Sequence, residues 1–505
     1  MTDPVFATSA QRGFRRLPTP QKPRTSSRLH RHPTNPTSGN VGVPNTSVTC
    51  RGNGTDSRHV DGHVRPRRRF ADWSMTVLAR VLIRVFFRSI EVEDGEHLPD
   101  DGPVVLVANH TNGLVDGLLL MAALRRYPRF LGKSTLFKVP PLWPFLKLAG
   151  VIPVDRSIDA VAGDHNVSAF ATSHTLLRDG GMVAVFPEGI SHDEVTLQPL
   201  KTGAARIALE AADDEGAEDL VTVAVGLVYD AKALFRSRAL VRVGQPVKVA
   251  QWTEAYGRDE RATVRAVTED LVAQLEHVNP SYSSWAQATQ LSWIAELVVR
   301  GSHEDQSGDP GLADRVHVAT CLAARQDACP ESLQQLFSDF ATYERDLELV
   351  GVSDAQLVTG SARRRLGLRV VWSALKVLVA LPFAVLGALV HVIPFQIMKQ
   401  VGKRPANEGI KATVKLLGCF VLFAATYVVV GVLAGRAYGA WTGLGAALAA
   451  PLCGFLTVRL LEWVRRLGGV VEGYRIIKAH RNILGPVLAH RAAVVRDARS
   501  ILPQP

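Results

Sequence analysis

The C-terminal third of this 505-residue chain contains three uncharged, mostly apolar runs. They cover residues 377–398, 416–435 and 437–458. A helix needs about 20 consecutive apolar residues to cross the hydrocarbon core of a bilayer. Each run meets that requirement, and three buried helices of a soluble protein are a weaker explanation at these lengths. Part of the chain is therefore expected to fold as helices in a membrane.

Basic residues are distributed unevenly around these runs. Four arginines at 363, 364, 365 and 369 precede the first run, and three at 459, 465 and 466 follow the last. Five Lys or Arg residues lie within 399–415, whereas only Arg436 lies between the second and third runs. Positive charges near the ends of spans are retained on the cytoplasmic side. All three clusters satisfy this rule if the first run does not cross.

We therefore predict a transmembrane helix pair at 416–458. Pro382 and Pro394 interrupt the first run, so residues 370–396 are predicted to form a re-entrant or transmembrane segment. Three crossings are the alternative, and they would export either the 399–415 cluster or the N-terminal part of the chain. Residues 459–505 are expected to form a basic helical tail.

Small residues recur within the second and third runs. Glycines stand four residues apart at 431, 435 and 439. Such spacing lets two helix backbones approach closely in a membrane. The pattern predicts close helix packing, although it is a weak signal by itself.

The first 70 residues carry 13 of the 58 Lys and Arg residues but only three of the 47 Asp and Glu residues. They lack periodic apolar residues, so a disordered basic tail is predicted at 1–70. It is either attracted to anionic lipid or lies upstream of a true start at Met75. Because the rest of the chain is nearly neutral, the net charge of +11 does not indicate a nucleic-acid partner.

Residues 75–90 place Arg80, Arg84 and Arg88 four apart on an otherwise apolar stretch. One basic stripe on an apolar helix is typical of a helix that lies at a membrane interface. The stretch is too short and too charged to span a bilayer. We predict an interfacial amphipathic helix, with a core helix that has one solvated stripe as the alternative.

Strand-like runs alternate with helical stretches from residue 91 to 280, which indicates an α/β domain. The runs cover residues 104–108, 150–154, 182–186, 221–228 and 239–243. Residues 281–362 then show helical patterns and predict a helical elaboration. The five cysteines are odd in number and scattered, so neither a disulfide framework nor a zinc site is predicted.

A histidine and an aspartate follow the first of these strands. His110 lies just past the run at 104–108, at the strand end where open α/β sheets bind ligands. A turn at 111–113 separates it from a helical pattern that begins at Leu114, so Asp116 falls in the first helical turn. With this turn between them, His110 and Asp116 can meet.

Such a pair is suited to general-base catalysis. The aspartate fixes one imidazole tautomer, and the other ring nitrogen takes a proton from a hydroxyl. The alternative is a histidine that caps a helix beside a solvated carboxylate. Further motifs at regular intervals favour the catalytic interpretation.

Other candidate residues also follow strand-like runs. Arg156 presents a planar cation suited to a bidentate phosphate contact, or else pairs with a nearby aspartate on the surface. Glu188 can accept a hydroxyl, and Gly189 permits close backbone approach, although such residues also form ordinary turns. Lys201 precedes a predicted helix start, which is an anion-binding position. Lys133, in the segment Gly-Lys-Ser-Thr-Leu-Phe, has a solvated surface lysine as its alternative to the binding role that the family resemblance below implies.

These motifs resemble those of the glycerolipid phosphate acyltransferase family, which includes glycerol-3-phosphate and lysophosphatidic acid acyltransferases. The resemblance covers roughly residues 75–249 and rests on the His110–Asp116 pair and on segments 150–156, 185–193 and 223–229. The family usually has four residues between the histidine and the aspartate, whereas five intervene here.

The third motif also departs from the commoner form, which has Thr-Arg after the glycine. This chain has Ile190, Ser191, His192 and Asp193 there. Both departures are similar to the fungal-type glycerol-3-phosphate and dihydroxyacetone-phosphate acyltransferase branch.

The resemblance implies an acyltransferase-like catalytic domain with a mixed sheet at residues 91–280. His110 would deprotonate a hydroxyl of a phosphorylated glycerol acceptor, and Asp116 would orient its ring. The residues expected to bind substrate are Arg156, Glu188, Gly189, Lys201 and Lys133. The acceptor is open among glycerol-3-phosphate, dihydroxyacetone phosphate and lysophosphatidic acid.

The chain is thus predicted to be a membrane-bound O-acyltransferase of phospholipid synthesis. Its donor would be acyl-CoA or acyl carrier protein, its other partners would be membrane lipids, and no cofactor or metal is expected. The chain is predicted to be a multi-pass membrane protein with its catalytic domain on the cytoplasmic side. A non-catalytic lipid-binding or scaffolding protein and a phospholipid-remodelling acyltransferase are the alternatives.

Overall fold

Short runs of β-branched residues form a mixed sheet. The computed structural model describes residues 66–139, 142–155, 164–213, 217–232, 234–302, 310–361, 366–401, 408–479 and 484–503. The strands within these ranges are β1 (Phe87–Glu93), β2 (Val104–Ala108), β3 (Arg129–Lys133), β4 (Ile152–Val154), β5 (Met182–Val185), β6 (Val221–Tyr229), β7 (Ser237–Val243) and β8 (Val247–Lys248).

The described strands follow the order β1-β7-β6-β2-β5-β3-β4, and β8 pairs with β6. β6 runs antiparallel to β7 and β8, and the other neighbouring pairs are parallel. The carboxyl ends of β2, β3, β4, β5 and β6 therefore meet at one edge. The predicted α/β fold with a mixed sheet is confirmed. β1, β3 and β8 were not among the predicted strands.

Strand β2 lies inside the sheet with both faces covered. Val104 and Leu106 belong to one core cluster, which includes residues of helices α1 (Pro66–Phe86) and α2 (Leu114–Ala123). Val105 and Val107 belong to a second cluster, which includes residues of α5 (Gly203–Ala212) and α7 (Glu260–Val278). Successive side chains of a strand point to opposite faces, so a run of valines and leucines suits a strand that is buried on both.

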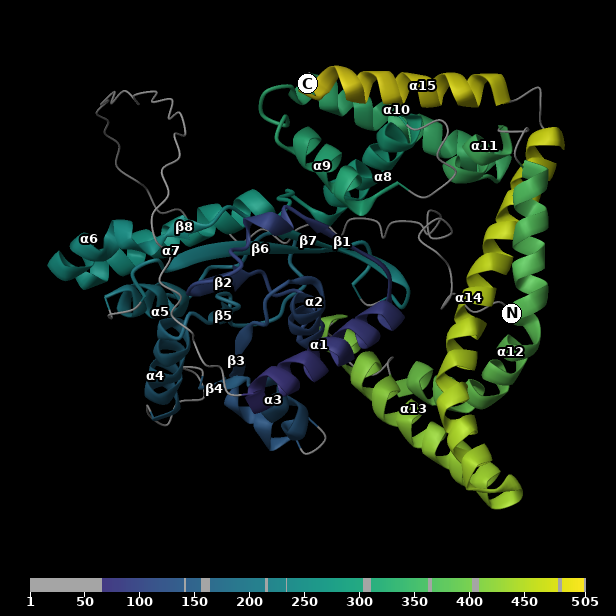
Figure 1. The fold of residues 1–505 in the computed structure, drawn as a ribbon. Coiled ribbons are helices and arrows are strands. Elements are labelled where there is room, and N and C mark those ends of the chain that lie inside the picture. The colour runs from purple at the N-terminus through teal and green to yellow at the C-terminus, as the bar shows by residue number, and fades with distance from the viewer. Residues whose placement is uncertain are drawn as a thin grey trace, which may run out of the picture. The chain divides into compact units, whose positions relative to one another are not determined.

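The remaining helices of this part of the chain are short. They are α3 (Trp143–Ala149), α4 (Asp164–Arg178) and α6 (Thr253–Arg258). Figure 1 shows these three helices around the sheet. It also shows α1 and α2 apart from α5 and α7.

The N-terminal boundaries differ from the prediction. The disordered tail was predicted to extend to residue 70, but residues 66–70 already belong to α1. Arginine is a good helix former, so the basic stretch before Phe70 continues the helix. The interfacial helix was predicted at 75–90, but α1 ends at Phe86 and residues 87–90 belong to β1. Pairing with β7 takes these residues into the sheet.

Helix α1 combines the two alternatives for this segment. Met75, Ala79, Ile83 and Phe86 are buried in the core, at helical spacing. Trp73, Val77, Val81 and Val85 are exposed large apolar side chains on the same helix. A helix with one buried face and one exposed apolar face suits a domain that lies against a membrane surface.

The described residues within 281–361 form the predicted helices. They are α8 (Trp285–Ser302), α9 (Leu312–Ala323), α10 (Pro330–Val350) and α11 (Asp354–Ser361). The C-terminal helix α15 (Leu484–Ile501) packs into the same core cluster, where Val494 meets residues such as Leu336 and Tyr343. Figure 1 shows α15 lying along α10. We call these five helices the helical layer.

Two acidic groups attach the helical layer to the sheet. Glu91 of β1 accepts the backbone N–H groups of Leu312 and Ala313 at 2.9 and 2.8 Å, at the start of α9. A carboxylate is favoured at a helix N-terminus by the free N–H groups and by the helix dipole. Asp230 pairs with both Arg238 of β7 and Arg315 of α9.

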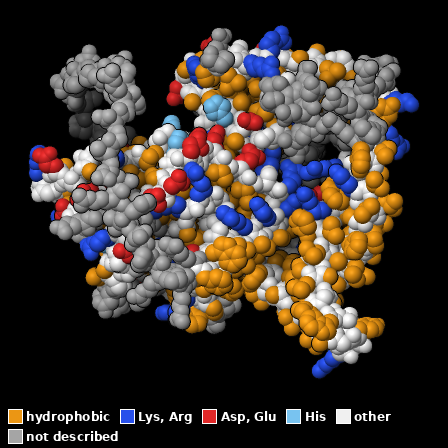
Figure 2. Space-filling model, viewed as in Figure 1, with side chains coloured by type: hydrophobic (Ala, Val, Ile, Leu, Met, Phe, Trp, Pro, Cys, Tyr) orange, Lys and Arg blue, Asp and Glu red, His pale blue; other side chains and the backbone are white. Residues whose placement is uncertain are grey.

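Three long apolar helices complete the chain. They are α12 (Leu366–Val401), α13 (Glu408–Tyr438) and α14 (Ala440–Ala479), and each contains a stretch long and apolar enough to cross a membrane. Figure 2 shows their hydrophobic side chains on the surface. These features indicate membrane association. All described elements belong to one unit that begins at residue 64.

Helix α12 contradicts one of the two forms predicted for residues 370–396. Residues 370–396 were considered as a re-entrant segment in the form of a hairpin, but they lie within the single helix α12, which contains Pro382 and Pro394. In an apolar segment, a lost backbone hydrogen bond at a proline does not force the chain to turn back.

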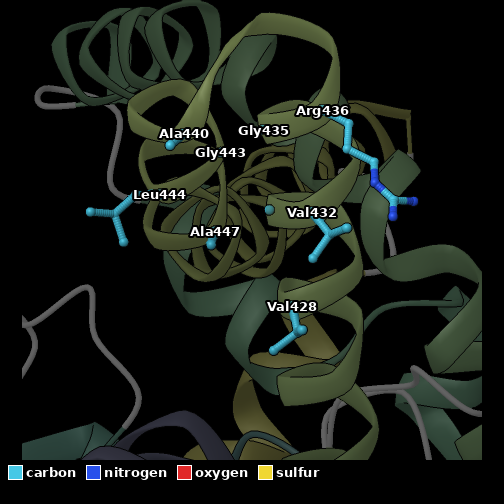
Figure 3. Close-up of a pocket in the computed structure, with 9 residues that line it drawn as sticks. Val428, Val432, Gly435, Arg436, Ala440, Gly443, Leu444 and Ala447 are labelled. Atoms are coloured by element: carbon cyan, nitrogen blue, oxygen red, sulfur yellow. The ribbon is translucent and has the colours of Figure 1, made fainter.

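The glycine pattern of α13 is partly confirmed. Gly435 faces Gly443 of α14, and a Cβ atom added to Gly443 would lie 2.6 Å from the carbonyl oxygen of Gly431. Gly439 does not pack between the helices as predicted, because it forms the turn between them with φ +96°. Figure 3 shows the apolar groove that α13 and α14 form beside these glycines, with Arg436 at its edge.

Several predictions concern residues outside the described ranges. They are the tail at 1–65, Arg156, the arginines at 363–365 and the basic residues at 403 and 404.

We expect Asp72→Asn to destabilise the protein. Asp72 Oδ2 lies 2.6 Å from Arg129 Nη2, and both side chains are largely buried. Removing the carboxylate charge should lower the free energy of unfolding by about 1–3 kcal/mol. Thermal unfolding in detergent measures this loss of stability. A chain that begins at Met75 lacks Asp72 and should show the same loss.

Asp100→Asn is the matched control, because the Asp100–Arg125 pair is exposed and such pairs contribute little. Equal stability of Asp72→Asn and the parent would contradict a stabilising pair.

Candidate active site

The predicted histidine and aspartate meet at the carboxyl edge of the sheet. His110 follows β2, and Asp116 lies in the first turn of α2. Gly113 precedes α2 with φ +56° and lets the chain reverse between strand and helix. His110 Nδ1 is 2.9 Å from Asp116 Oδ2. The predicted pairing of these two side chains is therefore present in the structure.

The Asp116 carboxylate is completely buried and has three hydrogen-bond partners. Oδ2 accepts the Asn112 backbone N–H at 2.7 Å in addition to His110 Nδ1. Oδ1 accepts the Tyr229 hydroxyl at 2.5 Å. A buried carboxylate needs such donors, because it has lost its hydration. The three contacts fix both its position and its role as an acceptor.

These contacts define the tautomer of His110. Because Asp116 acts as an acceptor, the Nδ1 atom of His110 carries a proton, so in the neutral form of the ring Nε2 presents the lone pair. Nε2 has no hydrogen-bond partner among the described residues, and the side chain is 18% exposed. A neutral imidazole with an accessible Nε2 is the arrangement that a general base requires.

The hydroxyl of Tyr229 stays protonated in this environment. Burial and the neighbouring Asp116 charge raise its pKa well above the ordinary value. It therefore remains a hydrogen-bond donor to the carboxylate throughout the physiological pH range.

Aromatic side chains support the imidazole ring. The rings of His110 and Phe186 are stacked with centroids 4.3 Å apart, and Phe186 in turn stacks on Phe130 at 6.0 Å. This stack restricts rotation of the imidazole. Phe186 follows β5, so neighbouring strands supply His110 and its support.

Glu188 makes contacts inside the protein beside His110, and its contact with a substrate hydroxyl stays a prediction. Its side chain is 3% exposed, and Oε1 accepts the His110 backbone N–H at 2.7 Å. Oε2 contacts His192 Nε2 and accepts the Gln198 N–H at 3.1 Å. Both carboxylate oxygens are thus engaged inside the protein. Glu188 is therefore positioned to hold the loops around His110.

Gly189 and Lys201 lie together beside this carboxylate. Gly189 has φ +72°, and a Cβ atom at this position would lie 2.9 Å from Lys201 Nζ. The Lys201 backbone N–H donates to the Pro187 carbonyl at 2.8 Å, and its side chain is exposed. The two predicted binding residues are therefore neighbours, with an exposed cation next to the catalytic loops.

The other two predicted cations are Lys133 and Arg156. Lys133 is the last residue of β3 and pairs with Val154 of β4. Asp155 follows β4 and contacts the Ser134 hydroxyl. Arg156 lies outside the described residues, but it follows Asp155 directly in the sequence.

Three important residues were not identified from the sequence. Asn109 donates to the Leu227 carbonyl at 3.0 Å and accepts the Leu227 N–H at 2.7 Å, which ties the end of β2 to β6. Tyr229 and Lys232 contact Asp116 and the loop at 111–113. A signal for Tyr229 exists, since it is the polar end of the apolar run at 221–229.

Residues 89–227 match the family model described as Acyltransferase. The chain is 34% identical over 124 residues to glycerol-3-phosphate O-acyltransferase 2 of Saccharomyces cerevisiae, which covers 24% of this chain and 17% of the relative. It is 30% identical over 141 residues to 1-acyl-sn-glycerol-3-phosphate acyltransferase alpha of Ovis aries, covering 27% of this chain and 48% of the relative. The matched region thus spans less than half the length of either relative.

A solved structure was also found to be similar. It is the 1-acyl-sn-glycerophosphate acyltransferase PlsC from Thermotoga maritima, with a TM-score of 0.31 and 17% sequence identity. The match covers 43% of this chain and 86% of that chain.

We expect His110→Ala to reduce acyl transfer by about 10²–10⁴-fold, because it removes the proposed general base. Tyr229→Phe should reduce kcat by about 10–100-fold, since it removes one hydrogen bond to a charged carboxylate. Tyr256→Phe on α6 is the control and should match the parent. Steady-state kinetics on purified membranes measure all three, and near-normal turnover of His110→Ala would remove the mechanism.

Proposed function

We propose that this chain, in which residues 89–227 belong to the Acyltransferase family, transfers a fatty acyl group from a thioester donor to a hydroxyl of a phosphorylated glycerol in membrane lipid synthesis. The observation that carries this proposal is the His110–Asp116 pair within the matched region. The names of the relatives from Saccharomyces cerevisiae and Ovis aries support the substrate class.

The reaction needs two proton transfers, one to His110 and one from His110. The acceptor hydroxyl lies against His110 Nε2, which takes its proton as the oxygen attacks the thioester carbonyl. The resulting tetrahedral intermediate collapses, the ester bond remains and the C–S bond breaks. The protonated imidazole then returns the proton to the leaving thiolate. Asp116 stabilises the imidazolium through Nδ1–H, as in other histidine–aspartate pairs.

Basic residues near the site are suited to the acceptor phosphate. Lys201 is exposed beside Gly189, and Lys133 ends a strand at the same edge of the sheet. Arg156 supplies a third cation in the segment after β4. Arginine and lysine bind phosphate through charge-assisted hydrogen bonds, and arginine does so in a bidentate manner. We assign phosphate binding to Arg156 and Lys201, with Lys133 as a further contact.

The acyl donor is proposed to be acyl-CoA or acyl carrier protein. Both present the acyl group as a thioester, and the general-base mechanism does not distinguish between them.

The decisive experiment supplies labelled acyl-CoA to membranes that contain the protein. Glycerol-3-phosphate, dihydroxyacetone phosphate and lysophosphatidic acid are added separately, and the product is identified by mass. We expect an acylated product with at least one acceptor and none with His110→Ala membranes. Acylation of a larger phospholipid alone would support a remodelling enzyme. A lack of any product, also with acyl carrier protein as donor, would support a non-catalytic lipid-binding protein.

We further propose that the chain crosses the membrane twice, with the catalytic domain on the cytoplasmic side. The position of α15 supports an even number of crossings. It shares a core with α8 and α10, and Arg491 of α15 lies 2.6 Å from Asp354 of α11. Because α9 of the same layer is attached to the sheet through Glu91, α15 lies on the side of the catalytic domain.

The contacts near the ends of α12 bear on which helices cross. Near its start, Gln356 of α11 donates to the Gly469 carbonyl of α14. Near its end, Met398 packs against Gly418 of α13. Leu416, two residues before this glycine, is buried in the core cluster that includes residues of α1 and α2. Phe420, two residues after the glycine, has its ring centroid 5.6 Å from that of Phe145 in α3. The start of α13, next to the end of α12, is thus close to the catalytic domain, and we propose α13 and α14 as the crossing pair because this choice keeps the basic clusters on one side.

Cysteine labelling tests this topology after the native cysteines are replaced. Asn407→Cys and Ser500→Cys should be protected from an impermeant reagent in intact cells and react after permeabilisation. Tyr438→Cys, beside the exposed turn between α13 and α14, should react from outside. The retention of positive charge on the cytoplasmic side predicts this result. Labelling of positions 407 and 500 from outside, with the catalytic domain protected, would establish three crossings.

A further inference from the structure

The connection between β6 and β7 lies between the catalytic pair and the membrane helices. We use the name active-site hairpin for its described residues, 229–232 and 234–237. The hairpin begins with Tyr229, which donates to Asp116, and it ends at the start of β7. The contacts on its two sides involve different parts of the chain.

On the inner side, the hairpin supports the loops of the active site. Lys232 Nζ donates to the Thr111 carbonyl at 3.1 Å and to the His192 carbonyl at 3.2 Å, and it pairs with Asp193. The Lys232 carbonyl accepts the side-chain amide of Asn112 at 3.1 Å. Together with Tyr229, this lysine therefore connects the hairpin to the turn that brings His110 and Asp116 together.

On the outer side, the hairpin is attached to a membrane helix. Arg236 Nε is 2.6 Å from Glu462 Oε1 of α14, and Arg236 Nη2 is 3.4 Å from Oε2. Arg236 Nη1 also donates to the carbonyls of Arg84 and Phe87, each at 2.9 Å. The side chains of Arg236 and Glu462 are only 11% and 17% exposed. A largely buried two-point arginine–carboxylate contact defines both distance and orientation.

The backbone of Arg236 needs this support. Its φ is +65°, in the left-handed region that residues other than glycine rarely adopt. Such strained conformations persist only when the surrounding contacts hold them. Glu462 is the only one of these contacts that comes from a membrane helix among the described residues.

The other end of the hairpin is held by the helical layer. Asp230, next to Tyr229, pairs with Arg238 and with Arg315 of α9. Burial opposes the charge of Asp230, but the two arginines hold its pKa below the ordinary value. With this end fixed independently, movement caused by loss of Glu462 is expected mainly around Arg236 and Lys232.

We propose that Glu462 is a positioning residue: through Arg236 it holds the active-site hairpin where Lys232 and Tyr229 support the His110–Asp116 pair. The membrane helix α14 would then contribute to turnover as well as to anchoring. The catalytic consequence rests on the proposed acyltransferase function, whereas the mechanical link between α14 and the hairpin does not.

Glu462→Gln removes the charge with little change in shape. We expect kcat to fall about tenfold, because a small misplacement of catalytic groups is costly. The KM of the acyl donor should change less than twofold. Glu472→Gln is the matched control, since Glu472 is an exposed glutamate on the same helix, and it should behave like the parent.

A second variant tests whether the effect passes through the hairpin. If Glu462 acts through Tyr229 and its neighbours, Glu462→Gln should cost clearly less in a Tyr229→Phe background than in the parent. Two independent sites would instead give multiplicative losses in kcat. Multiplicative losses would overturn the proposed route from α14 to the catalytic pair.

Hydrogen exchange measured by mass spectrometry separates this proposal from the proposed function. In nanodiscs, Glu462→Gln should increase amide exchange in peptides that cover 229–237 and 109–113, while peptides from α7 stay unchanged. Faster exchange without any acyl transfer by the parent would retain the link and refute the acyltransferase. Unchanged exchange and unchanged kcat would overturn the link, as would a uniform increase over the whole chain, which indicates general destabilisation.

Discussion

The burial of the Asp116 carboxylate is the constraint on which the rest of the active site depends. A fully buried negative charge is tolerated only with several donors, and here they come from His110, Asn112 and Tyr229. Each donor needs a different part of the fold: the end of β2, the turn before α2 and the end of β6. The mixed sheet brings these parts to one edge, so the catalytic geometry follows from strand order.

The sequence was informative where a pattern is local. The run of β-branched residues predicted β2, and the short polar turn between it and a helical pattern predicted that His110 and Asp116 would meet. Tyr229 could not be found in this way, because it lies 113 residues from Asp116 and reaches it only through the pairing of β2 with β6. The contacts of Glu188 with the His110 and Gln198 backbones could not be predicted either, because they depend on how separate loops meet.

The boundaries of the elements depended on tertiary contacts in the same way. Residues 89–93 alternate polar and apolar side chains, but residues 87–90 also continue the preceding apolar stretch, and they form a strand because β7 lies beside them. Gly439 fits a helix-packing repeat by spacing, yet its positive φ makes it the turn, and Gly443 packs against the partner helix instead. A spacing rule describes which residues are small, but it does not say where a helix ends.

The core that α15 shares with α8 and α10 has a consequence for the order of folding. Residues 484–501 supply Val487, Val494 and Ala498 to this core, and they are synthesised after α13 and α14. Until they leave the ribosome, the apolar faces of α8 and α10 have no cover from α15. Partly folded chains with such surfaces are prone to aggregate. Completion of the helical layer is thus delayed until the three long apolar helices have been made, so the last helix to be synthesised closes a core that begins before them in the chain.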